Sequence, residues 1–224
     1  MLQVILSGGI FHDFSGTSQL LADYAEHLQM ASIIVEHPDE AFALIQAGGV
    51  SLLTVNALHW PMAGEKYDPY RDVWRYEMNG EHAQTLQQFM VQGGNLLGLH
   101  TASICFSDWP GWQTLLGGRW VWGQSFHPDP SSLSLTPTPA GMDFGLKHFT
   151  TTDERYTDLE ISPEAQVLMV GSDSECAGEP LVWRKTMGEG RAAYSALGHD
   201  AHSLASAGVK HLLMKLMAWL VRLD

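Results

Sequence analysis

The stretch Gly93-Gly94-Asn95-Leu96-Leu97-Gly98-Leu99-His100-Thr101-Ala102 decides how the chain is expected to fold. Its three leucines are typical of a short buried strand, and the two glycines before them end a helical pattern. Gly98 and Ala102 flank His100 at two-residue spacing, which is the outline of a nucleophile elbow, where a strand turns sharply into a helix. An elbow would raise the imidazole of His100 above the sheet edge. The alternative is a hydrogen-bonded histidine that simply ends a strand.

Before this stretch, apolar strands alternate with helices, and this alternation predicts a parallel sheet. Residues 56–80 are rich in Pro, Gly, Tyr and Trp and are too long for a plain connection, so they indicate a functional or interface loop. Ser15 is the expected N-cap of the first helix. We expect strands at residues 2–6, 32–35 and 49–55, and helices at 15–30, 38–47 and 80–92.

After the elbow the pattern changes to strands with little helix between them. We expect a helix at 103–116, interrupted at 109–111, strands at 119–126, 132–136, 156–161, 166–171, 180–186 and 191–197, and a final amphipathic helix at 203–220. The sequence therefore predicts one α/β domain over residues 1–224, with a mostly parallel sheet and a β-rich second half.

Composition narrows the classes of partner. The formal net charge is −13 at pH 7, and no cluster of Lys and Arg exists that could neutralise phosphates, so a nucleic-acid partner is not expected. Charged residues interrupt the most apolar run, so no membrane partner is expected either. Two cysteines are too few for a disulfide framework and indicate a cytoplasmic protein. Aromatic residues in the 56–80 loop favour a homodimer.

Several motifs follow one another along nearly the whole chain: residues 9–13 (GIFHD), the stretch 93–102, residues 116–118 (LGG) followed by His127-Pro128, residues 153–156 (DERY), residues 180–183 (PLVW), residues 188–191 (GEGR) and residues 194–200 (YSALGHD). In this order they resemble the ThuA-like, or trehalose-utilisation, family. The resemblance implies a flavodoxin-like, class I glutamine-amidotransferase-like fold, a three-layer sandwich. It also implies a setting in carbohydrate utilisation, with trehalose or a related keto-sugar as the substrate class.

The same resemblance places two histidines at the site. In related amidotransferase-like proteins the elbow holds a cysteine, and a later strand ends in the histidine that activates it. Here His100 takes the cysteine position, and His199 follows the last expected strand, where the partner histidine would be. Both imidazoles would then lie at the carboxyl ends of the strands, where open α/β sheets bind ligands. Cysteine-dependent amidotransferase chemistry is therefore not expected.

Three functions fit such a site, each directed at a small sugar or sugar derivative. In the first, His100, His199 and Glu154 perform acid/base catalysis of the isomerase, epimerase or hydrolase type. In the second, a divalent metal such as zinc binds to histidines drawn from His12, His100, His127 and His199. In the third, the protein is a non-catalytic sugar-binding or interaction module. The expected ligand-binding residues are His12, Asp13, His127, Tyr156 and Asp200.

Overall fold

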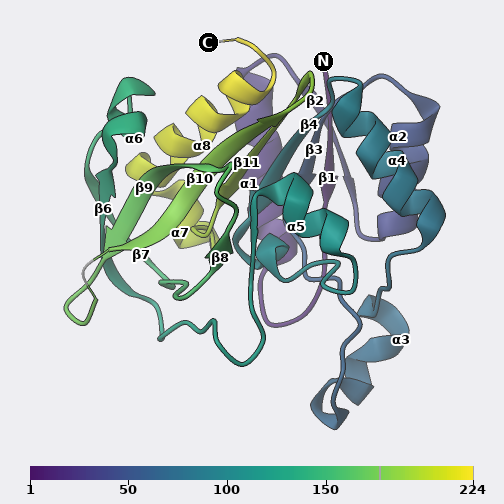
Figure 1. Ribbon diagram of the computed structural model, residues 1–224, viewed down its shortest axis with the longest axis horizontal. Helices are drawn as coiled ribbons and strands as arrows, with labels where there is room; N and C mark the ends of the chain where they lie inside the picture. The colour runs from purple at the N-terminus through teal and green to yellow at the C-terminus, as the bar shows by residue number, and fades with distance from the viewer. Residues whose placement is uncertain (177, 224) are drawn as a thin grey trace.

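The computed structural model describes residues 1–176 and 178–223 and is built around one large sheet (Figure 1). Within those residues the sheet has nine strands in the order β2-β1-β3-β4-β11-β10-β9-β6-β7. The strands are β1 (Leu2–Leu6), β2 (Ala31–Val35), β3 (Val50–Val55), β4 (Asn95–Leu99), β6 (Ser131–Pro137), β7 (Phe149–Asp153), β9 (Gln166–Ser172), β10 (Glu179–Met187) and β11 (Gly190–Ser195). A separate two-stranded sheet pairs β5 (Gly118–Arg119) with β8 (Glu160–Ile161).

Five strands, β2, β1, β3, β4 and β11, pair in parallel and form the first half of the sheet. Strand β4 is buried along its whole length, which explains the continuous apolar run in its sequence. It lies between β3 and β11, so the turn that follows it opens at the centre of the carboxyl edge. Side chains that follow β1, β4 and β11 are thereby brought to the same edge of the sheet.

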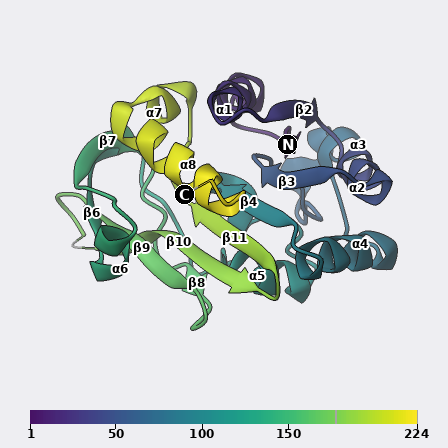
Figure 2. The same cartoon turned by 90° about the horizontal axis from the view of Figure 1, so that it is seen from above.

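Helices cover both faces of the sheet (Figure 2). On one face, α1 (Phe14–His27) packs against α7 (Ala201–Ala205) and α8 (Ala207–Leu220). On the other, α4 (Gly80–Val91) packs between α2 (Pro38–Ala47) and α5 (Pro110–Leu116). A short helix, α6 (Pro139–Asp143), packs on β9 and β6. No helix in the described part of the chain is both long and apolar enough to cross a membrane.

Helix boundaries depart from the predictions where a capping side chain intervenes. Helix α1 begins at Phe14 because Asp13, and not Ser15, is its N-cap and accepts a hydrogen bond from the Gly16 N–H. The single helix predicted at 203–220 is two helices, because Ser206 ends α7 and caps α8. The helix predicted at 103–116 is reduced to a 3-10 turn, η2 (His100–Ser103), and α5.

The second half of the sheet is antiparallel, through β10, β9, β6 and β7. Residues 188–189 form the tight turn of the β10–β11 hairpin, in which Met187 pairs with Gly190. The strands predicted at 119–126 and 156–161 are wrong in extent, because only β5 and β8, of two residues each, are strands there. Strand β7 was not predicted, since its half-exposed edge position leaves no apolar run in the sequence.

Residues 56–80 are not a plain loop. They include the 3-10 helix η1 (Glu65–Tyr70) and helix α3 (Arg71–Trp74), which protrude from the body beyond the carboxyl ends of the parallel strands (Figure 1). A second, smaller hydrophobic cluster anchors the protrusion; it consists of Ile10, Phe14, Leu58, Trp60, Met62 and Tyr67. The protrusion is therefore attached to the loop that follows β1.

Candidate functional site

His100 sits at the sharp turn between β4 and η2. Its backbone is in the left-handed region, with φ of 46°, an uncommon conformation for a residue with a side chain. A Cβ on Gly98 would lie 2.5 Å from Leu116 Cδ1 and 3.3 Å from Ala102 Cβ, so only glycine fits there without displacing its neighbours. The hydroxyl of Tyr194, on β11, donates a hydrogen bond of 2.7 Å to the His100 carbonyl. These contacts hold the elbow that the sequence predicted.

The imidazole of His100 is buried and fixed in one orientation. Its Nδ1 lies 2.7 Å from the carbonyl oxygen of Ala196, which can only accept, so Nδ1 carries the hydrogen. In the neutral ring, Nε2 then presents a lone pair. This lone pair lies 3.2 Å from Oε2 of Glu154 and 3.2 Å from the hydroxyl of Tyr156. Nitrogen and carboxylate lone pairs that face each other repel, unless a proton or a metal ion lies between them.

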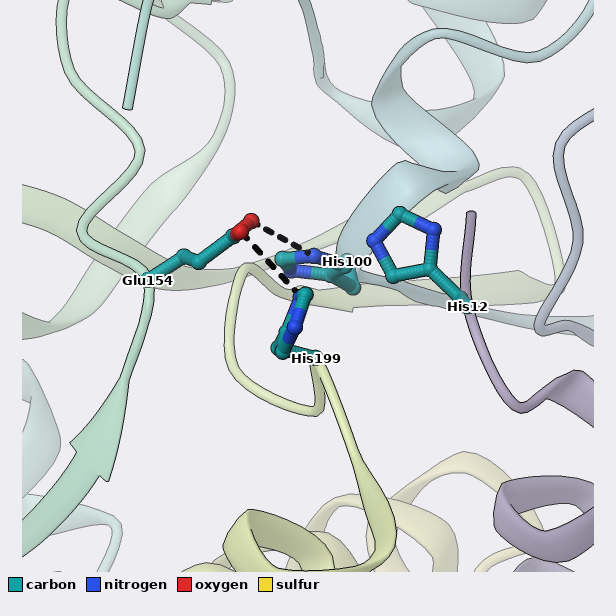
Figure 3. Close-up of side chains that lie close together, drawn as sticks. All are labelled: His12, His100, Glu154 and His199. Atoms are coloured by element: carbon teal, nitrogen blue, oxygen red, sulfur yellow. Dashed lines mark ion pairs between the residues drawn. The ribbon is translucent and has the colours of Figure 1, made fainter. Parts of the chain in front are cut away.

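Four side chains meet at this point and form what we call the histidine cluster: His12, His100, Glu154 and His199 (Figure 3). They follow β1, β4, β7 and β11, so four separate connections contribute one residue each. The ring centroid of His12 lies 5.1 Å from that of His100 and 4.9 Å from that of His199. One potential ligand atom from each residue lies within 4.8 Å of every other.

Most of these ligand atoms have no hydrogen-bond partner. Among the described residues, four buried side-chain atoms are unpartnered, and three of them belong to the cluster: Nε2 of His12, Oε2 of Glu154 and Nδ1 of His199. Buried polar atoms are normally paired, because an unpaired one costs about 1–3 kcal/mol. Three such atoms within one cluster are what a cation-binding site offers.

The electrostatics of the cluster suit a cation. Burial, together with the nearby His100 and His199, lowers the pKa of His12 to about 4. The ring is then neutral near pH 7, as a metal ligand must be. Burial opposes ionisation of Glu154, but its interactions with His100, His127 and His199 lower its pKa overall, so it remains a carboxylate. Three imidazoles and one carboxylate are a donor set that fits zinc and similar divalent ions.

Asp153 holds the cluster together, although no role was predicted for it. Its buried carboxylate accepts hydrogen bonds from the backbone N–H groups of Glu154, Gly198 and His199 at 2.8, 2.8 and 3.3 Å, and from the hydroxyl of Ser203. It therefore ties the end of β7 to the connection between β11 and α7, and these segments carry Glu154 and His199. Its only sequence signal is its place in the residues 153–156 motif.

Two further predicted residues border the cluster. The hydroxyl of Tyr156 faces His100, and burial raises its pKa well above the usual value, so it stays protonated. His127 is 41% exposed, and its Nδ1 lies 3.3 Å from Oε1 of Glu154. The same oxygen lies 3.2 Å from Nδ1 of His199. Glu154 thus faces His100 with one oxygen and two other histidines with the other.

The remaining two predicted residues serve helix ends. The carboxylate of Asp13 caps α1, and that of Asp200 caps α7 by accepting from the Ser203 N–H at 2.7 Å. Among the described residues, no hydrogen bond or ion pair joins either carboxylate to the side chains of the cluster. Cys105 is fully buried, and burial raises its pKa to about 12, so it does not supply a thiolate.

The converging side chains of the histidine cluster, and not a large cavity, mark the candidate site. A cavity of about 400 Å³ lies at the opposite edge of the sheet, beside Met1, Val50 and Asn95. None of the cluster residues lines it, and the parallel strands begin there. The carboxyl edge carries the concentration of titratable side chains that a reactive site requires.

Comparison with known families decides the relationship. The model of the ThuA family, described as trehalose utilisation, matches residues 65–220. The chain belongs to the ThuA family. His100, Glu154 and His199 lie inside the matched range, and His12 precedes it. Membership suggests a role in trehalose utilisation. Comparison with curated proteins gives no match.

Solved structures confirm that the fold is shared with ThuA-like proteins. A ThuA-like protein from Parabacteroides merdae superimposes with a TM-score of 0.76 at 15% identity, covering 99% of this chain and 90% of that one. A cytoplasmic protein from Salmonella typhimurium gives a TM-score of 0.67 at 12% identity, covering 98% and 99%. A β-galactosidase from Rahnella gives 0.58 at 13% identity, covering all of this chain but 31% of that enzyme. At these identities the likeness is one of fold alone.

Proposed function

We propose that the histidine cluster binds one divalent transition metal, zinc in the first instance, and that this ThuA protein performs metal-assisted chemistry on a sugar derivative of trehalose utilisation. The observation that carries the proposal is the convergence of three buried, unpartnered ligand atoms, from His12, Glu154 and His199, on the Nε2 lone pair of His100. A cation at this point would remove the repulsion between His100 and Glu154. It would also satisfy every unpartnered atom of the cluster.

The protein side chains have separate roles in this proposal. A bound metal would supply Lewis acidity and a water of lowered pKa. The carbonyl of Ala196 holds the Nδ1 hydrogen of His100, so that Nε2 is left to bind the metal. His127, half-exposed beside Oε1 of Glu154, is placed to take a proton from a sugar hydroxyl or return one. These roles suit hydrolysis or isomerisation of a sugar, with no covalent intermediate on the protein.

A metal-free mechanism is the second candidate, and the contacts of Glu154 favour it. Oε1 lies 3.3 Å from His127 and 3.2 Å from His199, so this carboxylate could pass a proton between two imidazoles. Acid/base isomerisation or epimerisation of a keto-sugar needs such a pair. If the same residues bind a sugar without catalysing a reaction, the protein is a sugar-binding module.

The experiment is metal analysis of the purified protein after loading with Zn²⁺ and removal of free metal, with His199→Ala and His202→Ala as a matched pair. His202 is exposed and lies outside the cluster. We expect one metal ion per chain in the wild type and in His202→Ala, and a loss in His199→Ala. The absence of retained metal in the wild type would overturn the metal proposal. Turnover of trehalose or its keto-derivatives by that metal-free protein would then support the acid/base mechanism.

The same proposal includes the fold class, the cellular location and the partners of the protein. The parallel strand order β2-β1-β3-β4-β11 corresponds to the 2-1-3-4-5 order of flavodoxin-like folds, which supports a class I glutamine-amidotransferase-like three-layer sandwich in a single domain. Both cysteines are free thiols, which supports a cytoplasmic location. We expect a small-molecule sugar partner, neither nucleic acid nor membrane, and a homodimer in solution.

A further inference from the structure

Exposed aromatic side chains gather at the edge of the sheet that carries the histidine cluster. Among the described residues, the large aromatic side chains that are strongly exposed are Phe11, Tyr70, Trp122 and Phe126. All four lie in the connections after β1, β3 and β5, and Tyr70 is the last residue of η1. Exposed apolar groups that gather around one site mark a binding surface more often than chance exposure does.

Trp122 separates two cavities within this surface. The indole is 53% exposed and lines both of them. One cavity, of about 170 Å³, is also lined by Trp109, Trp112 and Trp120. The other, of about 350 Å³, is lined by Trp60, Pro61 and Asp108. The larger cavity is within the range of about 300–1,000 Å³ that small-molecule sites occupy, and the smaller one is below it. Tryptophans contribute to the walls of both cavities, together with polar and aliphatic residues.

Polar groups remain available beside these aromatic walls. Oδ2 of Asp108 accepts from the Met78 N–H at 2.8 Å, and its other oxygen has no protein donor in the described part of the chain. The indole N–H groups of Trp112 and Trp183 donate to carbonyls, whereas those of Trp120 and Trp122 have no acceptor among the described residues. Flat apolar faces combined with a free carboxylate oxygen and free N–H donors are what a pyranose ring requires, since its C–H face is apolar and its edge carries hydroxyls.

Trp120 connects this surface to the histidine cluster. Its ring centroid lies 5.0 Å from that of Tyr156, whose hydroxyl faces His100, and 6.0 Å from that of His127. One tryptophan therefore separates the smaller cavity from the residues that border Glu154. A two-ring glycoside could therefore place one ring in the cavity and the other at the cluster, on either side of Trp120.

We propose that the cavities on either side of Trp122 form a sugar-binding subsite, which holds the second pyranose ring of a disaccharide or glycoside whose first ring lies at the histidine cluster. This inference rests on the proposed function and adds to it the place where the second ring of such a glycoside binds. Stacking on Trp122 supplies the affinity, and Asp108 with the free indole N–H groups orients the hydroxyls.

The test is calorimetric titration with trehalose, which has two glucose rings, and with methyl α-D-glucopyranoside, which has one. We expect the wild type to bind trehalose about tenfold more tightly, which is about 1.4 kcal/mol, because the second ring adds an aromatic contact. Trp122→Ala should remove this preference, and Trp122→Phe should retain part of it. Met142→Ala, which changes an exposed apolar residue on α6, is the control and should leave the preference unchanged.

Metal content measured on the same samples separates this inference from the proposed function. Trp122→Ala should hold as much metal as the wild type, because no hydrogen bond or ring contact joins Trp122 to the cluster in the described part of the chain. Equal affinity for the two sugars, an undiminished trehalose preference in Trp122→Ala, or no binding of either sugar at millimolar concentration would each overturn the subsite. A trehalose preference that depends on Trp122 in a protein that holds no metal would support the subsite and refute the metal centre.

Discussion

Asp153 illustrates how one buried carboxylate can position a site without taking part in its chemistry. It is 1% exposed and carries a negative charge next to Glu154, which costs free energy unless donors surround it. Three backbone N–H groups and the Ser203 hydroxyl supply those donors. Because two of the donors belong to Glu154 and His199 themselves, the position of both ligands depends on this one side chain.

Asp153→Asn should therefore reduce stability and metal retention together. Asparagine has the same shape, but its NH2 group faces donors in place of an acceptor, and we expect a loss of about 2–3 kcal/mol in the free energy of unfolding. Urea unfolding measures this loss. Ser203→Ala removes one donor and should cost about 1 kcal/mol. A cost for Asp153→Asn no larger than that for Ser203→Ala would show that the carboxylate does not organise these connections.

At the scale of elements, the elbow was predictable from sequence because everything it needs is local. Gly98, His100 and Ala102 lie within five residues of one another. The glycine at position 98 signals close packing in the sequence itself, because a side chain there would meet its neighbours. Strand β7 was not predictable in this way. Its threonines alternate between buried and exposed at the sheet edge, and only pairing with β6 makes them a strand.

In the candidate site, too, some residues were predictable from the sequence and others were not. The resemblance pointed to His100 and His199, and the motif positions added His12 and Glu154. The sequence predicts Asp13 and Asp200 as ligand-binding residues, and in the structure each carboxylate accepts from an N–H at a helix start. The roles of the Ala196 carbonyl and of Asp153 depend on long-range contacts that no local pattern encodes.

His59 links the 56–80 segment to the first strand and makes the folding stability of the protein depend on pH. Its ring is buried between the carbonyl oxygens of Ser7, 3.2 Å from Nε2, and Trp74, 3.3 Å from Nδ1. Burial lowers its pKa below the usual 6.5. The unfolded chain therefore takes up a proton below about pH 6.5 that the folded chain resists, and folding stability is lost as the pH falls.

His59→Gln should weaken that pH dependence, because glutamine keeps a donor but does not titrate. In chelator-treated protein, we expect the free energy of unfolding of the wild type to fall below about pH 6.5 more steeply than that of the variant, by up to about 1.4 kcal/mol per pH unit. Urea unfolding above and below that pH measures the two slopes. Parallel slopes would show that His59 does not contribute.

At the scale of the whole molecule, the histidine cluster joins parts of the chain that are far apart in sequence. His12, His100, Glu154 and His199 follow four different strands, and only the folded sheet brings them within 4.8 Å of one another. An unfolded chain has no such arrangement, so a metal that uses all four residues binds the native state alone. Metal binding should then act as a cross-link between the parallel and antiparallel halves of the sheet.

Zn²⁺ should accordingly stabilise the whole fold in proportion to its binding. At a free concentration a hundred times its Kd, we expect the free energy of unfolding to rise by about 2.7 kcal/mol, measured by urea unfolding with and without chelator. His202→Ala should show the same rise, because it keeps the cluster and differs from the wild type only at an exposed imidazole. His199→Ala should show little, since three ligands remain and affinity falls. An equal rise in His199→Ala would mean that zinc stabilises the protein from another place, and the cluster would then have to be explained by protons alone.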